Sequence, residues 1–288
     1  MKNLIINVFK TFFFFDLAII FISFLPIIET ANNGLNTLIG EALTLLVVMI
    51  FSLVFNFIIE KNNRFKKQKS NLFKSLLFGL VFGLILPIIA ITILSVFKKF
   101  DIVTILGVSD LYYWLPALLI NAISCELLLR GYLLKLFKRE YNFFISAIIT
   151  TLLYFALNAE ILKMGVIVIA NAVLLNFIVC FIIEYSGSII SAITAHFLYS
   201  VISSFVFGSL KIWPDAPHLI DGLFTGKSYL SGGMYKIEGS IALLIPAAII
   251  LALLIYKKYK REIFGAIVFF NNKIVGFKDF IILKFKKN

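Results

Sequence analysis

The sequence predicts an all-α membrane protein, a helical bundle with about eight transmembrane helices. Two properties of the composition carry this prediction: 61% of the 288 residues are hydrophobic, and the mean hydropathy is +1.02. A soluble domain is only about 45–50% apolar, so a single water-soluble core cannot bury this many apolar side chains. The apolar residues also fall in blocks of about 20, the length at which a helix crosses roughly 30 Å of bilayer hydrocarbon.

The apolar blocks give the predicted domain organisation. Eight spans are predicted, at residues 11–28, 37–59, 75–97, 111–134, 142–160, 164–184, 187–207 and 239–256. Asp16 and the lack of a small-residue cleavage site favour a retained first helix over a cleaved signal peptide. We divide the chain into three N-terminal spans (1–110), a four-span core (111–207), an extracellular loop (208–238), and a last span with a basic cytoplasmic tail (239–288).

The distribution of basic residues predicts the orientation in the membrane. Placing the N terminus in the cytoplasm puts 20 of the 27 basic residues inside and six outside, as the positive-inside rule requires. We therefore expect a multi-pass protein of the cell membrane, in contact with its lipids, with both termini cytoplasmic. The net charge of +12 reflects this loop arrangement, and we expect no nucleic-acid partner.

The basic tail contains an apolar stripe at helical spacing, formed by Phe270, Ile274, Phe277 and Ile281. Lysines flank this stripe, a pattern typical of a helix that lies on an anionic inner leaflet. A ninth short or re-entrant membrane segment is the alternative interpretation of the same residues.

Charged and polar residues inside the spans are the candidate functional groups, because burying them in hydrocarbon is costly. The stretch "SCELLLRGYLL" (124–134) places Glu126 and Arg130 four residues apart, on one helical face, where they can form an ion pair. This pair is either a structural link between helices or part of an active site. His196, inside the seventh span, needs a polar partner, and Glu126, Asn158 and Cys125 are the groups available.

The other polar residues of the spans have structural interpretations. Asp16 and Glu41 lie near span ends, where they can reach the lipid headgroups, and Trp213 of the long loop can rest there as well. Asn171 and Asn176 are predicted to form hydrogen bonds between helices. Gly79 and Gly83, followed by Pro87, indicate a bend in the third span.

The polar residues of the fourth, fifth and seventh spans resemble the motifs of the CPBP family of intramembrane proteases. This family, also called Abi or CAAX-protease, includes lysostaphin-resistance-like proteins, and its motifs are E-E-x-x-x-R, F-x-x-x-H and H-x-x-x-N. The resemblance covers about residues 110–207. It includes "EYSGSIISAITAH" (184–196), which is similar to the family's Gly-Ser-Ile entry into its last motif helix. The resemblance implies an intramembrane-protease-like core.

The motif positions themselves are degenerate. Glu126, Arg130 and His196 match the family's second glutamate, its arginine and the histidine of the third motif. The remaining positions depart from the family pattern: Cys125 stands where the family has its water-activating glutamate, Tyr154 and Asn158 replace phenylalanine and histidine, and Ser200 replaces asparagine. The resemblance therefore implies a family fold whose catalytic base is lost.

The chemistry of the residues agrees with this interpretation. Peptide hydrolysis needs a base that takes a proton from water and donors that hold the oxyanion. Asparagine is no base at neutral pH, and an arginine partner makes Glu126 a weak proton acceptor. Zinc takes at least three protein ligands. Adjacent helical residues such as Cys125 and Glu126 point about 100° apart, so we expect neither a metal nor a cofactor.

Three functions follow, in order of preference. The first is a catalytically impaired pseudoprotease that binds or scaffolds a membrane-anchored or cell-envelope protein or peptide, as in resistance to bacteriocins or lytic enzymes. The second is an active intramembrane endopeptidase of the CAAX or bacteriocin-processing type, which uses Glu126 and His196 as catalytic residues, or Cys125 as a nucleophile with His196 as its base. The third is a transporter whose substrate path is lined by the polar centre.

Overall fold

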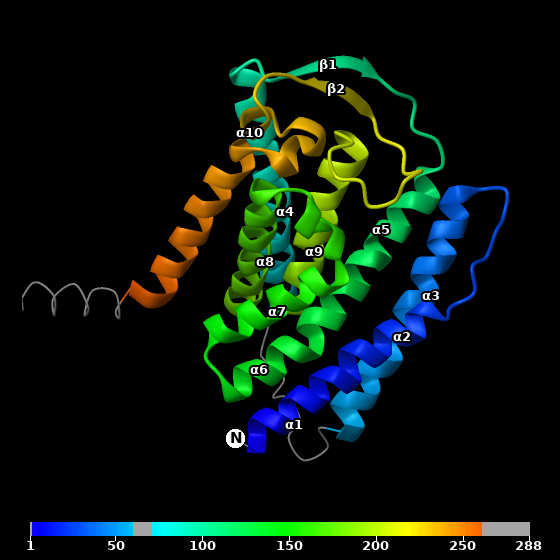
Figure 1. The fold of residues 1–288 in the computed structure, drawn as a ribbon, viewed down its shortest axis with the longest axis vertical. Helices are drawn as coiled ribbons and strands as arrows, with labels where there is room; N and C mark the ends of the chain where they lie inside the picture. The colour runs from blue at the N-terminus through cyan, green and yellow to red at the C-terminus, as the bar shows by residue number, and fades with distance from the viewer. Residues whose placement is uncertain (1, 60–70, 261–288) are drawn as a thin grey trace, which may run out of the picture. The chain divides into compact units, whose positions relative to one another are not determined.

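The fold is described by a computed structural model, which covers residues 2–59 and 71–260 (Figure 1). Most of these residues are helical and few lie in strands, which confirms the all-α prediction. The chain divides into two compact units, residues 1–247 and the part from 248 onward, and every predicted site residue lies in the first. Most of the predicted cytoplasmic loop (60–70) and the apolar stripe from Phe270 to Ile281 lie outside the described residues.

Seven helices in the described part of the chain are long and apolar enough to cross a membrane, so the protein is a multi-pass membrane protein. They are Ile6–Ser23, Asn33–Asn56, Leu72–Val96, Leu111–Glu140, Val166–Ser186, Ile189–Val206 and Gly233–Lys260. The predicted span at 142–160 is a 15-residue apolar helix, Phe143–Leu157. At 1.5 Å per residue it is about 22 Å long, short of the bilayer core.

The N-terminal part consists of two long helical segments. Their elements are α1 (Lys2–Thr11), the π-helical turn η1 (Phe12–Asp16), α2 (Leu17–Ser23), α3 (Asn33–Leu53) and the π-helical turn η2 (Val54–Ile59). The first segment begins earlier and ends sooner than the predicted span at 11–28. The second begins where the side chain of Asn32 accepts a hydrogen bond from the backbone N–H of Leu35 at 3.0 Å, a typical N-terminal cap.

The elements that carry or border the candidate site follow. In chain order they are α4 (Leu72–Val96), α5 (Leu111–Glu126), η3 (Leu127–Leu133), α6 (Leu134–Glu140), α7 (Phe143–Leu157), η4 (Ala159–Lys163), α8 (Val166–Ser186), α9 (Ile189–Ser200) and η5 (Val201–Val206). The segments η3 and η5 are π-helical turns, and η4 is a 3₁₀ turn.

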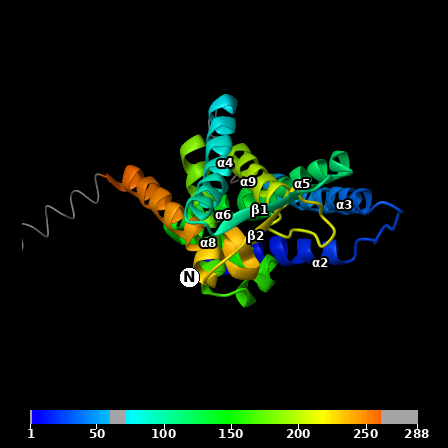
Figure 2. The ribbon, with the colours of Figure 1, turned by 90° about the horizontal axis from the view of Figure 1, so that it is seen from above.

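Helices α4 and α9 lie side by side in both views (Figures 1 and 2). A Cβ atom on Gly79 would lie 2.5 Å from the Cβ of Thr194, and one on Gly83 would lie 2.7 Å from the carbonyl oxygen of Ala195. The GxxxG spacing therefore lets the two backbones approach closely, as in many membrane helix pairs. These glycines serve packing, while α4 continues as one helix through Pro87. This contact fixes the helix that carries His196.

The fourth span is a continuous helix that runs from α5 through η3 to α6, beyond its predicted end at residue 134. Its last turns carry Lys135, Lys138 and Arg139, residues that end a hydropathic block but form helix well. The π-helical turn η3 begins directly after Glu126 and contains Arg130. Such turns inside α-helices are often found at functional sites.

Two segments that were expected to be loops form a short antiparallel sheet. Strand β1 (Phe100–Ile105) pairs with β2 (Ile220–Phe224), so that Phe100 lies opposite Phe224. A Cβ atom on Gly222 would lie 2.2 Å from the ring of Phe100, so only glycine fits there. The sheet is followed by α10 (Ser228–Ser231) and the 3₁₀ segment η6 (Gly233–Gly239).

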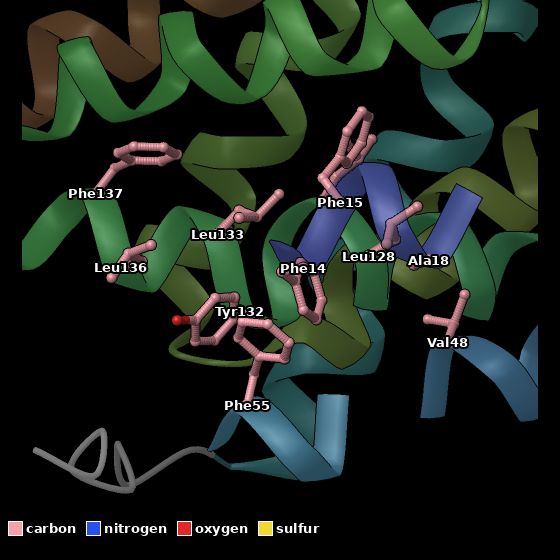
Figure 3. Packing of buried hydrophobic residues seen from close by; sticks show 11 residues of the cluster. Phe14, Phe15, Ala18, Val48, Phe55, Leu128, Tyr132, Leu133, Leu136 and Phe137 are labelled. Atoms are coloured by element: carbon pink, nitrogen blue, oxygen red, sulfur yellow. The ribbon is translucent and has the colours of Figure 1, made fainter. Parts of the chain in front are cut away.

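One apolar cluster joins the N-terminal helices to the fourth span (Figure 3). The rings of Phe14, Phe55 and Tyr132 contact one another with centroids 4.7–5.4 Å apart. Each of these rings is less than 8% exposed, and Figure 3 shows the tyrosine ring next to both phenylalanines. Because η3 supplies Tyr132, this packing also holds the turn that contains Arg130.

Candidate functional site

Glu126 and Arg130 form the ion pair that their spacing predicts. The Nη1 atom of Arg130 donates to both carboxylate oxygens of Glu126 at 2.8 Å. The side chains are 1% and 2% exposed, so water has almost no access to either group. Two buried charges at this distance stabilise each other, whereas one alone would be strongly unfavourable. The carboxylate is therefore held in place at the end of α5.

Arg130 also connects its helix to α8. Its Nη2 atom donates to the Oδ1 of Asn176, and the amide of Asn176 donates to the carbonyl oxygen of Ala172 at 2.9 Å. The predicted interhelical role of Asn176 is thus confirmed, although the sequence did not indicate Arg130 as its partner. Asn171 also bonds outside its own helix, because its amide donates to the backbone carbonyls of Glu238 and Ser240 at 2.8 and 3.2 Å.

His196 reaches Glu126 from the neighbouring helix α9. Its Nδ1 lies 3.1 Å from Oε1 of Glu126, and its side chain is 24% exposed. The chain leaves α8 at Gly187, whose φ of +74° suits glycine. Helix α9 then begins where Ser188 accepts a hydrogen bond from the N–H of Ile190 at 3.2 Å. The "GSI" stretch therefore sets the start of the helix that presents the histidine.

Cys125 lies in the same place as Glu126 and His196. The thiol sulfur, a carboxylate oxygen and an imidazole nitrogen of these three residues all lie within 4.8 Å of one another. Adjacent residues of a helix point about 100° apart, yet both of these side chains have a possible ligand atom close to the ring of His196. His196 approaches from α9, and its ring lies within reach of both side chains at the end of α5.

The other motif positions lie around this group without joining it. The amide of Asn158 donates to the backbone carbonyl of Tyr154 at 3.0 Å, at the end of α7. Tyr154 packs against the aromatic cluster and is close enough to interact electrostatically with Cys125 and Glu126. Ser200 is 1% exposed, and its hydroxyl has no hydrogen-bond partner among the described residues.

A second buried carboxylate, Glu238, was missed because it falls at the end of the segment expected to be a loop. Its Oε1 accepts hydrogen bonds from the hydroxyls of Tyr199 at 3.2 Å and Ser209 at 3.4 Å. Its Oε2 is buried and has no partner within the described part of the chain. Its position directly before an apolar span was the signal that could have indicated a buried role.

Glu41, expected to lie near a span end, has hydrogen-bond partners inside the protein. Its Oε1 accepts hydrogen bonds from the amide of Asn121 at 3.1 Å and from the indole of Trp213 at 3.3 Å. Trp213 in turn packs on Trp114, with ring centroids 5.8 Å apart. The N–H group of Trp213 therefore has a polar partner inside the protein.

A pocket lies away from the motif residues, between the N-terminal helix and the α6–α7 corner. Its volume is about 360 Å³. Asp16 contributes to its wall, and the side chain of Asn7 is buried there with an amide group that has no partner among the described residues. The complete lining is Asn7, Val8, Thr11, Phe12, Asp16, Phe137, Tyr141 and Ile149.

The part of the chain that carries the motif residues is similar to a known protein family. Residues 107–202 match the Rce1-like family. The description of this family is type II CAAX prenyl endopeptidase Rce1-like, and the match confirms the resemblance predicted from the motifs. No curated protein matches the chain.

The matched segment contains all seven motif positions and covers about a third of the chain. The carboxylates of Glu41 and Glu238, and the pocket residues before α5, lie outside it. The family match therefore applies to the Glu126–Arg130–His196 group and leaves the second carboxylate group unassigned.

Proposed function

We propose that this protein is a CPBP-type membrane protein that has lost hydrolysis and acts by binding a membrane-anchored or cell-envelope protein or peptide. One observation carries the proposal: the Glu126 carboxylate is 1% exposed and both of its oxygens are bound by Arg130. A carboxylate held in this way is a weak proton acceptor. It acts as part of a link between α5, η3 and α8.

The replacements at the neighbouring positions support the same proposal. Cys125, which is half-buried, stands where the resemblance implies the water-activating glutamate, and its side chain offers no carboxylate to receive a proton from water. Asn158 stands where the family has histidine, and its amide is used to end α7. Because Arg130 binds both carboxylate oxygens of Glu126, His196 is the candidate base that remains among the motif residues.

The binding role also requires a place for a partner. The pocket next to Asp16 has apolar and polar walls and opens beside the N-terminal helix, away from the motif residues. We place the protein in the cell membrane with both termini cytoplasmic, because this orientation puts 20 of 27 basic residues inside. A partner would then meet the pocket from within the membrane or from its cytoplasmic side.

The test is peptide cleavage by the purified full-length protein in proteoliposomes. Substrates should include prenylated CAAX peptides, because the family model is named for them, together with unmodified membrane peptides. We expect no cleavage by the wild type and none by His196→Ala. The variant Cys125→Glu/Asn158→His, which restores two family residues, is the matched positive control. Reproducible wild-type cleavage that His196→Ala abolishes would overturn the proposal.

An active intramembrane endopeptidase is the alternative, favoured by the 3.1 Å contact between His196 and Glu126. In that reaction His196, the more exposed member of the pair, would receive the proton of water, and Glu126 would stabilise the imidazolium that forms. Glu126→Asp keeps the charge that Arg130 needs but withdraws the carboxylate from His196. The alternative predicts lost cleavage in a folded Glu126→Asp protein.

A further inference from the structure

Cys125, Glu126 and His196 present three different metal-binding atoms to one point between α5 and α9. These atoms are a thiol sulfur, a carboxylate oxygen and an imidazole nitrogen, and they lie within 4.8 Å of one another. We propose that they form a binding site for one zinc-type divalent ion. This proposal goes beyond the proposed function, because it concerns ion binding and holds whether or not peptides are cleaved.

The distances require only a small movement of the side chains. Zinc bonds of 2.0–2.3 Å in a tetrahedral arrangement place neighbouring ligand atoms about 3.3–3.7 Å apart. The nitrogen of His196 and the oxygen of Glu126 are 3.1 Å apart, close to this separation. The remaining separations exceed it by about 1 Å at most, which rotation of the cysteine and histidine side chains can remove.

The identity of the ligand atoms selects the class of ion. Thiolate and imidazole suit zinc and similar transition metals, whereas magnesium and calcium prefer sites made of oxygen atoms alone. Three protein ligands leave a fourth position for water, as in zinc sites that exchange a ligand. A glutamate at position 125 would give a site of two carboxylates and one imidazole. Cys125 replaces one hard carboxylate ligand with a soft sulfur ligand, which favours zinc and similar metals.

The surroundings of Glu126 hold its carboxylate in one orientation. Arg130 donates to both oxygens at 2.8 Å, and Asn176 fixes Arg130 from α8. Carboxylates that bind metals are usually hydrogen-bonded in this manner, and each oxygen keeps a second lone pair for the ion. The positive charge of Arg130 weakens binding of a cation, so the negative charge of a Cys125 thiolate is needed to offset it.

His196 is more exposed than the carboxylate that it contacts. Its side chain is 24% exposed, in contrast to 1% for Glu126. Cys125 is half-buried, so both ligands that approach the carboxylate have some exposure. The ion would connect α5 to α9, the helix that α4 holds through Gly79 and Gly83.

The experiment is a Co²⁺ titration of the full-length protein in detergent after treatment with a chelator. Co²⁺ substitutes for zinc and reports a sulfur ligand by its charge-transfer absorption and a tetrahedral site by intense visible bands. We expect one ion per chain, with both signals removed by added Zn²⁺. Cys125→Ser should lose the charge-transfer band, and His196→Ala should weaken binding about 10-fold or more, at least the effect of losing an outer hydrogen bond.

Cys180→Ser is the matched control, because Cys180 is the other cysteine of the chain and is buried in α8 beside the hydroxyl of Thr150, 3.6 Å away. It should keep the cobalt spectrum. Absence of a charge-transfer band in the wild type, or a band that survives Cys125→Ser, would overturn the proposal. Thermal unfolding without metal verifies that each variant is folded, and peptide cleavage plays no part in the readout, so the proposed function is tested separately.

Discussion

The carboxylates of Glu126 and Glu238, which α9 contacts through His196 and Tyr199, differ in the groups that bind them. Glu126 is bound by the guanidinium of Arg130 and by His196, whereas Glu238 accepts hydrogen bonds from the hydroxyls of Tyr199 and Ser209. His196 and Tyr199 are three residues apart on α9, so they lie on adjoining faces of one helix. Helix α9 therefore contributes to two groups. The charged group consists of Glu126, Arg130 and His196, and in the hydroxylic group two hydroxyls bind Glu238.

The difference indicates two kinds of constraint. The charged group requires each of its members, because removing one leaves an uncompensated charge in a low-dielectric interior. In the hydroxylic group, a neutral side chain of the same shape can replace that of Glu238, because the hydroxyls of Tyr199 and Ser209 need only an acceptor. Glu126, Arg130 and His196 lie within the residues that match the family, whereas Glu238 lies beyond them. We expect the two to respond very differently to the same substitution.

The largest effect is predicted for Glu126→Gln. The change keeps the shape of the side chain but leaves Arg130 buried without a counter-charge, which should lower the free energy of unfolding by about 3–5 kcal/mol. The measurement is thermal or denaturant unfolding of the purified protein in detergent. The double variant Glu126→Gln/Arg130→Met removes both charges and should recover most of this loss. Equal instability of the single and double variants would contradict the pairing argument.

A smaller effect that touches both groups is predicted for Gly83→Val. A Cβ there would meet the backbone carbonyl of Ala195 at 2.7 Å, so α9 must move away from α4. We expect a loss of about 1–3 kcal/mol, the usual range for overpacking. Gly40→Ala is the control, because a Cβ on Gly40 meets nothing within 4 Å. Unfolding of Gly83→Val at the same temperature or denaturant concentration as the wild type would contradict the close contact of α4 and α9.

The helical bundle was predictable because hydropathy reports directly on burial in lipid. All eight predicted spans correspond to helices in the described residues, with errors at their ends, and seven of these helices are long enough to cross a membrane. The fourth span was predicted too short, since Lys135 and Arg139 end the apolar block but not the helical hydrogen bonding. The sheet was missed, because β1 finds its partner roughly 120 residues later in the chain, where Phe100 pairs with Phe224.

The candidate site was predictable only where its residues follow a local spacing or a motif. The pair of Glu126 and Arg130 follows from their separation of four residues on a helix. Asn176 as the partner of Arg130, and Tyr199 as the partner of Glu238, depend on how distant helices pack. The convergence of Cys125 and His196 depends on how α9 packs beside α5, and the sequence of either helix alone does not give this packing.

The smallest effect is predicted for Glu238→Gln, the same substitution as in the first prediction. The amide oxygen can still accept from Tyr199 and Ser209, and the amide nitrogen replaces Oε2, which has no partner in the described part of the chain. The stability should therefore change by about 1 kcal/mol or less. The same unfolding assay compares it with Glu126→Gln. A loss as large as that of Glu126→Gln would mean that Glu238 also compensates a buried cation, and the contrast between the two carboxylates would then disappear.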